Sequence, residues 1–210
     1  MEKHGRLFIA RHGETVFNAA ARLQGEHAHT PLTRTGFEQV DEMGAVLRHR
    51  LGPQSGLELW SSSAGRALQT LAIMAEHLGL DWHDAHHDDR LVEIGMGSWG
   101  GRYYADVTAE HGSVVDEEYR LLKPAPDGET YAEIAMRVSS WFEDHGRSAR
   151  DKLVIMHGIS SRVLRGVLLG LEPLPGYEAP VADGLPQGSV VMIDKGVETL
   201  VVEGTGGERA

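Results

Sequence analysis

Two short apolar runs in this chain each end in a His-Gly pair. Residues 7–10 (Leu-Phe-Ile-Ala) lead directly into residues 11–13 (Arg-His-Gly), and residues 152–156 lead into residues 157–158 (His-Gly). Runs of this kind are typical of buried strands. Residues that follow such strands lie at the carboxyl end of a sheet, where open α/β folds bind their ligands. We therefore expect both pairs to lie at one edge of one sheet.

Each histidine has a structural interpretation and a functional one. Alone, His12 is compatible with an ordinary turn and His157 with the cap of a helix. Two such turns at two strand ends favour a shared site, in which an imidazole acts as a nucleophile. Arg11 is then placed to hold an anion, and Gly13 to let backbone approach a ligand. The rest of the chain must supply the partners that such a site needs.

The composition limits the class of protein. The chain has 210 residues, 41% of them hydrophobic and 24% charged, which is ordinary for one globular domain. Its net charge of −11 argues against a nucleic-acid or anionic-membrane surface. The lack of cysteine excludes disulfides, thiolate metal ligands and a cysteine nucleophile. We see no signal peptide and no apolar run near about 18 residues, and we expect a cytoplasmic protein.

Strand-like runs and helical periods alternate along the chain. Further strands are predicted at residues 57–60, 189–193 and 197–202. The last two strands flank a short turn and are predicted to form an antiparallel hairpin. Apolar stripes with helical spacing fall within residues 37–51, 68–78, 131–142 and 163–171. The alternation predicts an α/β fold, a three-layer sandwich with a mostly parallel central sheet and an antiparallel edge strand.

The segment 97–127 fits neither period well. It is rich in glycine, tyrosine and acidic residues, with a weak helical pattern at residues 110–122. Insertions of this kind often cover a site, so we expect a lid-like insertion of helix and loop. Residues 1–203 are expected to form a single domain, and residues 204–210 a disordered tail.

Two charged residues are candidates for the missing partners. Arg66 falls in the first turn of a predicted helix after three serines, where free backbone N–H groups and a guanidinium together bind anions. The alternative is an ordinary capped helix with a solvated arginine. Glu93 lies between apolar neighbours, and desolvation raises a carboxyl pKa toward the range of a general acid. The alternative for Glu93 is a solvent-facing position on an edge.

In combination these segments resemble the histidine phosphatase superfamily, the phosphoglycerate-mutase-like proteins. The resemblance runs from Leu7 to about Val202. The matching motifs are Arg11-His12-Gly13-Glu14-Thr15 with Phe17-Asn18, Gln24-Gly25, Thr30-Pro31-Leu32-Thr33, Ser62 and Ser63 with Arg66, Gln69 and Thr70, Leu91 and Glu93 with Gly97 and Trp99, Gly128-Glu129-Thr130, and His157-Gly158.

The resemblance implies a role for each candidate residue. His12 attacks phosphorus and carries the phosphoryl group, and Glu93 protonates the leaving alkoxide and then helps to activate water. The phosphate oxygens are surrounded by Arg11, Arg66, His157 and the backbone N–H of Gly158. Asn18, Gln24 and Gly25 are the further substrate-binding candidates. No metal and no cofactor are implied, because two guanidinium groups and a second histidine supply the charge that phosphoryl transfer requires.

Three segments depart from the family pattern or suggest another site. Residues 26–30 (Glu-His-Ala-His-Thr) differ near the expected site entrance, and Gly100-Gly101 replaces a common Glu-Gly pair. Residues 83–89 contain histidines and aspartates at spacings compatible with metal ligands. We favour a solvated approach strand for this last segment over a metal site.

The choice between phosphatase and mutase depends on the segment 97–127. Its basic residues are Arg102, Arg120 and Lys123, and it carries more acidic residues than basic ones. A net-acidic cover suits a monophosphate ester better than a bisphosphate. We therefore predict a metal-independent phosphatase of the histidine acid type, acting on a small-molecule phosphate ester. The alternatives are a cofactor-primed phosphoglycerate mutase and a non-catalytic binding protein on the same fold. The resemblance is compatible with a homodimer.

Overall fold

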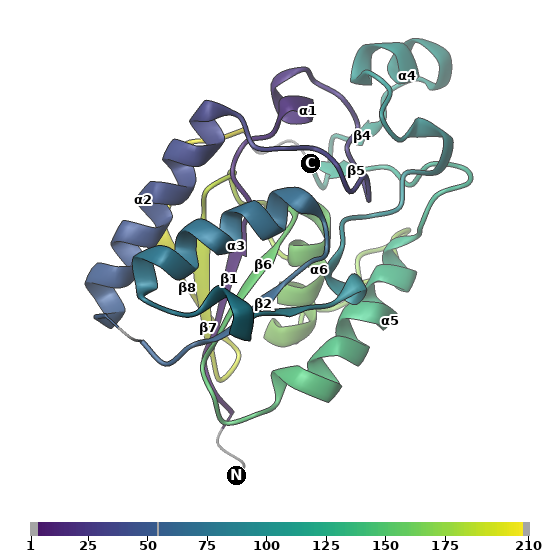
Figure 1. The fold of residues 1–210 in the computed structure, drawn as a ribbon. Helices are drawn as coiled ribbons and strands as arrows, with labels where there is room; N and C mark the ends of the chain where they lie inside the picture. The colour runs from purple at the N-terminus through teal and green to yellow at the C-terminus, as the bar shows by residue number, and fades with distance from the viewer. Residues whose placement is uncertain (1–3, 54, 208–210) are drawn as a thin grey trace.

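The central sheet has six strands in the order β3-β2-β6-β1-β7-β8. The computed structural model describes residues 4–53 and 55–207 (Figure 1). The strands are β1 (Leu7–Arg11), β2 (Glu58–Ser61), β3 (His86–His87), β6 (Lys152–Met156), β7 (Val190–Asp194) and β8 (Val197–Val202). The first four strands in this order are parallel, and β7 and β8 form an antiparallel hairpin beside β1. The mostly parallel sheet and the antiparallel hairpin at its edge both agree with the prediction.

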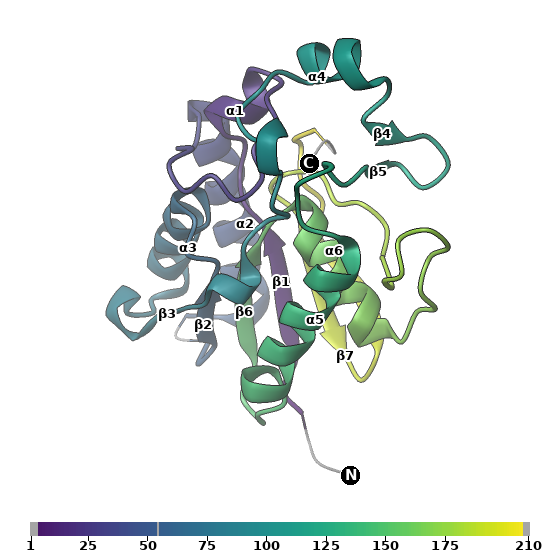
Figure 2. The same cartoon turned by 90° about the vertical axis from the view of Figure 1, so that its right-hand side faces the viewer.

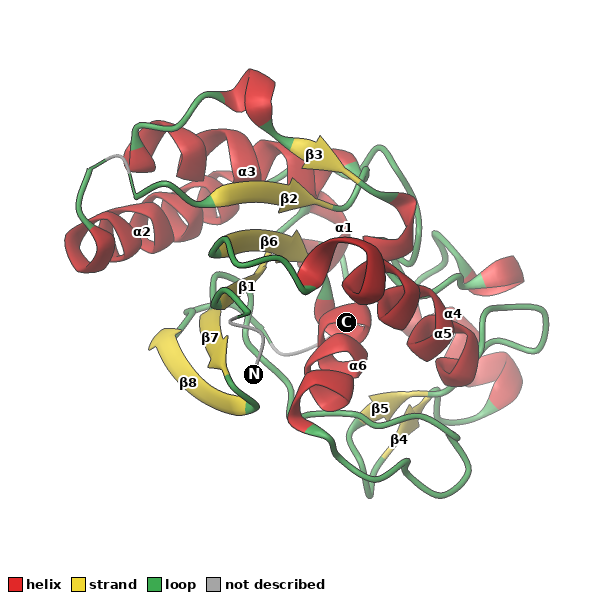
Figure 3. Cartoon of the chain, turned by 90° about the horizontal axis from the view of Figure 1, so that it is seen from below, coloured by secondary structure: helices red, strands yellow, loops and turns green. Residues whose placement is uncertain are grey.

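Helices cover both faces of this sheet and make the three layers. α2 (Arg34–Leu51) and α3 (Gly65–Leu78) pack on one face, and α5 (Tyr131–Trp141) and α6 (Gly158–Leu169) on the other (Figure 3). Strand β1 shows why, because its side chains alternate between the faces. Phe8 and Ala10 belong to the core on the α2 and α3 side, and Leu7 and Ile9 to the core on the α5 and α6 side.

The segment 97–127 differs from the weak helical prediction. Its helix is α4 (Tyr104–His111), and residues 110–122 are mostly the small hairpin β4 (Val115–Asp116) and β5 (Leu121–Leu122). The prediction of a helix there is wrong, because Gly112 ends α4 at a φ of 79° and the chain then turns back on itself. The remaining short elements are α1 (Val16–Ala19), η1 (Trp82–Asp84), η2 (Asp89–Leu91), η3 (Gly97–Trp99) and the π-helical turn η4 (Phe142–Gly146).

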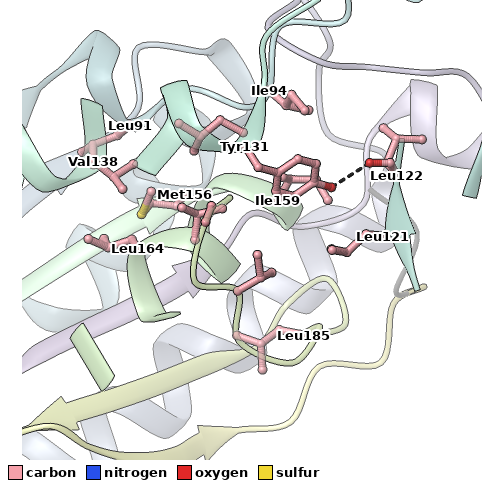
Figure 4. Close-up of a cluster of buried hydrophobic side chains, with 14 of the residues drawn as sticks. Leu91, Ile94, Leu121, Leu122, Tyr131, Val138, Met156, Ile159, Leu164 and Leu185 are labelled. Atoms are coloured by element: carbon pink, nitrogen blue, oxygen red, sulfur yellow. Dashed lines mark hydrogen bonds between the residues drawn. The ribbon is translucent and has the colours of Figure 1, made fainter. Parts of the chain in front are cut away.

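This insertion is anchored to the α5 and α6 layer. Leu121 and Leu122 are buried in the same cluster as Tyr131 and Ile159 (Figure 4). The Tyr131 hydroxyl also donates a 2.8 Å hydrogen bond to the Leu122 carbonyl. Figure 2 shows α1, α4, β4 and β5 gathered at one end of the molecule. We call residues 97–127 the cover.

The C-terminal segment is more ordered than the sequence suggests. The Gly204 N–H donates to the Ser189 hydroxyl at 2.9 Å, and the Gly206 N–H donates to the Gln187 carbonyl at 3.2 Å. The predicted disorder is therefore wrong for residues 204–207, since glycines let this segment lie directly against the loop before β7. Residues 208–210 of the predicted tail lie outside the described residues. Among residues 4–53 and 55–207, none of the helices combines the length and the hydrophobicity of a membrane span.

Candidate active site

The two His-Gly turns lie side by side at the carboxyl ends of β1 and β6. The backbone N–H of His12 donates to the Met156 carbonyl at 3.2 Å. The rings of His12 and His157 stand edge to face, with centroids 5.1 Å apart. Both side chains are buried, at 2% and 0% exposure. The structure thus brings together the two histidines that the sequence placed at separate strand ends.

His12 presents one unprotonated nitrogen to the site. Its Nδ1 lies 2.7 Å from the Gly13 carbonyl, which only accepts, so we assign the proton to Nδ1. Nε2 then carries a lone pair and accepts from Arg66 Nε at 3.3 Å. Burial, followed by the charges of Arg66 and Arg11, holds the pKa of His12 well below its usual value. The imidazole is therefore neutral, as a nucleophile must be.

Gly13 has a packing role. A Cβ at Gly13 would lie 2.4 Å from the Gly36 carbonyl on α2. The expected close approach of this glycine is therefore to a neighbouring helix. That contact fixes the turn that carries His12.

Arg66 is the centre of the site. It is fully buried in the first turn of α3, so the solvated alternative is wrong. Its Nε donates to both histidines, to His12 Nε2 at 3.3 Å and to His157 Nδ1 at 3.1 Å. Burial lowers the pKa of Arg66 to about 10, which leaves it charged at neutral pH.

The segment 25–30 wraps around this guanidinium. Arg66 Nη2 donates to the Gly25 carbonyl at 2.7 Å, and Nη1 donates to the His27 carbonyl and the Thr30 hydroxyl at 2.7 and 2.9 Å. Gly25 holds the arginine through its carbonyl, and its direct contact with substrate stays a prediction. Main-chain acceptors dominate here, which explains why side chains in this segment can differ from the family pattern.

Asn18 and Gln24 converge on Thr15. The Asn18 Oδ1 accepts from the Thr15 N–H at 3.1 Å, and the Asn18 N–H donates to the Thr15 hydroxyl oxygen at 3.2 Å, which closes a capping box on α1. The Thr15 hydroxyl donates its single proton to the Gln24 Oε1 at 2.5 Å. Both residues thus fix the loop that follows His12. Their direct contact with substrate stays a prediction.

In space, the Glu93 side chain lies at the amino end of α6, the helix that follows the His157 turn. Its carboxylate accepts from the N–H groups of Ile94, Ile159 and Ser160 at 3.0, 3.0 and 2.9 Å. The side chain is 4% exposed, so the solvent-facing alternative is wrong. A helix amino end stabilises a carboxylate in this position. Gly158 opens the same helix, and its N–H lies in the turn between His157 and these amides.

A second layer of side chains holds the segment that carries Glu93. Arg137 on α5 donates to the Glu93 carbonyl at 3.3 Å and pairs with Glu129 at 2.6 Å. Glu129 in turn accepts from the Gly95 N–H at 3.1 Å. The Gly-Glu-Thr segment singled out in the sequence therefore supports the acid motif.

A cavity of about 330 Å³ adjoins this site under the cover. Arg11, Gly158 and Ile159 form its inner wall. The remaining lining residues are Tyr104, Val115, Tyr119, Arg120, Leu122, Arg162, Asp183, Gly184 and Leu185. Arg11 is anchored there by a 2.6 Å bond from Nη1 to the Leu185 carbonyl and a 3.3 Å bond to the Gly207 carbonyl. The cover and the ordered C-terminal segment therefore both contribute to the surroundings of Arg11.

Sequence reasoning did not single out Arg162. Its Nε donates to the Ala182 carbonyl at 2.7 Å, and its Nη1 and Nη2 donate to the carbonyls of Arg120 and Tyr119 at 3.0 and 3.3 Å. Within residues 4–53 and 55–207 it forms no ion pair with a carboxylate. Its position four residues after Gly158 on the same helix was the available signal, because residues i and i+4 share a face.

The two departures from the family pattern contact each other. The His27 ring lies over Gly100 and Gly101, and a Cβ at Gly100 would come within 3.0 Å of His27 Nε2. A larger residue after Trp99 would displace this ring. Glu26 also contacts the segment before Gly100, accepting from the Met96 N–H at 2.8 Å. The two changes are therefore one structural feature beside the acid motif.

The segment 83–89 does not gather its side chains into a metal site. His86 stacks on Trp60 with centroids 4.7 Å apart, and His87 lies against Trp82. In the part of the chain that the structure describes, no group of three or more histidine, aspartate or glutamate side chains is arranged to hold a metal ion.

Comparison with known proteins identifies the family. The sequence pattern of the histidine phosphatase superfamily (branch 1) matches residues 7–201, and the chain belongs to this family. It is 30% identical over 177 residues to a Yersinia enterocolitica protein named "Probable phosphoglycerate mutase GpmB", covering 80% of this chain and 76% of the relative.

Solved structures give the same fold. A mycobacterial glucosyl-3-phosphoglycerate phosphatase in complex with VO3 is 26% identical, with a TM-score of 0.71 over 93% of this chain and 96% of that one. An alpha-ribazole phosphatase from Shigella flexneri shares the fold at 24% identity, with a TM-score of 0.70 over 93% and 94% of the two chains.

Proposed function

We propose that this protein hydrolyses phosphate monoesters of small molecules through a phosphoryl group carried transiently on His12. The observation that carries the proposal is the pair of hydrogen bonds from Arg66 Nε to His12 Nε2 and His157 Nδ1, at 3.3 and 3.1 Å. This buried guanidinium donates to neutral acceptors among the described residues, and the carboxylates that raise its pKa, Glu93 and Glu26, form no direct ion pair with it. A phosphoryl group adds a direct counter-charge and meets the nucleophile at the same point.

The reaction follows from this geometry in two displacements. The ester places its phosphoryl oxygens toward Arg11, Arg66 and the amino end of α6, which favours anions. His12 Nε2 forms a bond to phosphorus while the bond to the leaving oxygen breaks. Water then attacks phosphorus, and the nitrogen–phosphorus bond breaks to release inorganic phosphate. Charge neutralisation and in-line placement, which these residues supply, are what phosphoryl transfer mainly needs.

Glu93 is the group that we assign to the leaving alkoxide. It is the buried carboxyl beside Gly158, and in the unliganded site it accepts from three backbone N–H groups. To donate a proton it must arrive protonated, with one oxygen turned toward the leaving group. The resulting carboxylate is then the base that takes a proton from the attacking water.

The net negative charge of the cover supports hydrolysis of a monophosphate over transfer between two phosphorylated forms, although none of its acidic side chains is among the residues that line the cavity. The acidic residues of the cover are Asp106, Glu110, Asp116, Glu117, Glu118 and Asp127. A mutase must bind a bisphosphate and keep its phosphoenzyme away from water, and an acidic cover opposes the first requirement. The second candidate is a primed phosphoglycerate mutase, which the name of the Yersinia relative and the positions of Arg120 and Arg162 at the cavity support.

A phosphate-release screen tests the proposal. It should include sugar phosphates, phosphoglycerates, nucleotides, phosphoamino acids and phosphorylated cofactors, all in the presence of EDTA. We expect at least one small ester to be hydrolysed, and His12→Ala to lose at least about 10³-fold in kcat, as expected when a covalent nucleophile is removed. His49→Ala, an exposed histidine on α2, is the matched control.

Three results would overturn the proposal. One is undiminished hydrolysis by His12→Ala, and another is strong loss of activity in EDTA. The third is efficient interconversion of 3- and 2-phosphoglycerate, primed by 2,3-bisphosphoglycerate and with little hydrolysis, which would favour the mutase.

A further inference from the structure

His157 is held on its outer side by a residue that the two displacements do not use. Ser62 follows β2 directly and is fully buried. Its hydroxyl oxygen lies 2.7 Å from His157 Nε2 and accepts from the Ala64 N–H at 3.2 Å. The Ser62 N–H donates to the Ile155 carbonyl at 3.0 Å, which ties the turn to β6. Ser62 is thus rigidly placed against one nitrogen of His157.

The other nitrogen of His157 fixes where the ring proton is. Arg66 Nε donates to His157 Nδ1 at 3.1 Å, and a guanidinium only donates, so Nδ1 carries no proton in the empty site. Burial, then Arg66, His12, Arg137 and Arg11, hold the pKa of His157 well below its usual value, so the ring is neutral. Its single proton is therefore on Nε2 and is donated to Ser62.

We propose that Ser62 is a positioning residue that fixes the Nε2–H tautomer of His157, so that Nδ1 faces the phosphate site and takes up a proton when a phosphoryl group enters. This inference rests on the proposed function of the same site. Ser62 accepts the Nε2–H bond in both states, so the ring need not turn. What changes is Nδ1, an acceptor from Arg66 when the site is empty and a donor to a phosphoryl oxygen when it is loaded.

The proton for this step has a defined source. A monoanionic ester carries one proton on a phosphoryl oxygen. That O–H bond breaks as the Nδ1–H bond forms, which leaves a phosphoryl dianion beside an imidazolium. A dianionic ester instead requires one proton from water, and the same proton leaves with the product. No bond to phosphorus changes in this step. The new negative charge offsets the guanidinium charges that keep the empty ring neutral.

Removing the hydroxyl should release the tautomer. In Ser62→Ala the Nε2–H would be buried without an acceptor, which is costly. The ring would then favour the Nδ1–H tautomer. In that tautomer two donors, Nδ1–H and the Arg66 Nε–H, face each other with no acceptor between them. The expected loss in kcat is roughly tenfold to hundredfold, comparable with losses seen when the second contact of a functional histidine is removed.

Nitrogen-15 NMR of histidine-labelled protein tests the inference without turnover. In the empty wild type we expect His157 to show a protonated Nε2 and a bare Nδ1, and with saturating inorganic phosphate to show both nitrogens protonated. Ser62→Ala should lose the Nε2–H tautomer, and Ser62→Thr, which keeps the hydroxyl, should retain it. Ser63→Ala, which removes an exposed neighbouring hydroxyl bonded to Asp89, should behave as wild type.

The outcomes separate this inference from the proposed function. An Nδ1–H tautomer in the empty wild type, or a bare Nδ1 in the phosphate complex, overturns the role of Ser62. So does a Ser62→Ala protein with the wild-type tautomer. A wild type that shows both expected states but hydrolyses no ester in the screen supports the tautomer and overturns the proposed function instead.

Discussion

The buried site and the cover are built in different ways. The floor of the site, as we call it, consists of Arg11, His12, Arg66 and His157, which are at most 2% exposed, and backbone or buried side-chain atoms fix each of them. Of these four residues, Arg11 alone lines the cavity under the cover. In the cover, Arg120 is exposed and Tyr119 only half-buried, and both belong to a short hairpin. The floor is therefore set by turns next to strands, while the cover depends on tertiary contacts. Reaction chemistry and substrate choice can vary separately in such a protein.

Helix α6 shows the same contrast within a single turn. Arg165 is buried and makes a bidentate pair with Glu198, with Nε and Nη2 donating at 2.7 and 2.6 Å. Arg162 lies three residues earlier, lines the cavity and bonds only carbonyl groups among the described residues. Arg162 is half-buried, and a partly desolvated charge whose partners among the described residues are carbonyls is unusual in a structural role. We interpret Arg165 as part of the scaffold and Arg162 as part of the substrate site.

The largest expected effect is the loss of rate when the acid that protonates the leaving group is removed. Glu93→Gln should slow alkyl esters such as glycerol 3-phosphate about 10²- to 10³-fold, the usual range for general-acid catalysis. It should slow p-nitrophenyl phosphate less than about tenfold, because that phenolate leaves without a proton. Steady-state kinetics on both esters checks this, and equal losses on the two would remove Glu93 from the general-acid role.

The two arginines of α6 give a matched pair of substitutions. Arg165→Gln should lower the free energy of unfolding by about 3 kcal/mol, since it leaves a partly buried carboxylate unpaired. Denaturant unfolding measures this change. Arg162→Gln should instead raise KM roughly tenfold for glycerate 3-phosphate, whose carboxylate would lose a charged partner, and leave glycerol 3-phosphate nearly unchanged.

A control in the cover makes this comparison sharper. Arg102→Gln removes an exposed pair with Glu110 and should alter neither stability nor the ratio of the two KM values. If Arg162→Gln destabilises the protein as much as Arg165→Gln and leaves that ratio unchanged, Arg162 belongs to the scaffold.

The last prediction concerns the pH dependence of stability and the floor of the site alone. The pKa values of His12 and His157 are both well below 6.5 in the folded protein, so the unfolded chain binds their protons first as pH falls. Stability should therefore be constant above about pH 7 and decline below 6.5, by up to about 1.4 kcal/mol per pH unit for each histidine.

Denaturant unfolding between pH 7.5 and 5, at roughly half-unit steps, measures this slope. That window lies above the range in which the paired carboxylates of the scaffold titrate. Replacing both histidines by asparagine should flatten the curve. An unchanged slope in the double variant would show that these rings are not the buried neutral groups described above.

The sequence was sufficient to predict the longer elements, because they contain enough residues to show a hydrophobic period. The strands of residues 152–156 and 197–202 have the predicted bounds, and α5 lies within the helical stripe predicted for residues 131–142. Strands β3, β4 and β5 have two residues each, too few to show an alternation. They exist because neighbouring segments pair with them. The helix predicted at residues 110–122 is absent because Gly112 ends α4 and the chain then pairs β4 with β5.

The floor was predictable because each of its residues adjoins a strand or begins a helix. His12 and His157 follow apolar runs, and Arg66 begins α3. The partners were not predictable, because they depend on distant parts of the chain. Ser62 meets His157 across 95 positions, and Arg162 meets the Tyr119 carbonyl across 43. No local pattern encodes such contacts.

The most direct measurement is to locate the phosphoryl group during turnover. The protein is mixed with a hydrolysed ester, quenched in alkali to preserve phosphohistidine, and digested for mass spectrometry. We expect the phosphoryl group on His12, its absence in His12→Ala, and its accumulation with p-nitrophenyl phosphate in Glu93→Gln, because that phenolate leaves without a proton while water attack is slowed. A phosphoryl group on His157 or on any other residue would contradict the central claim, as would full-rate hydrolysis with none on the protein.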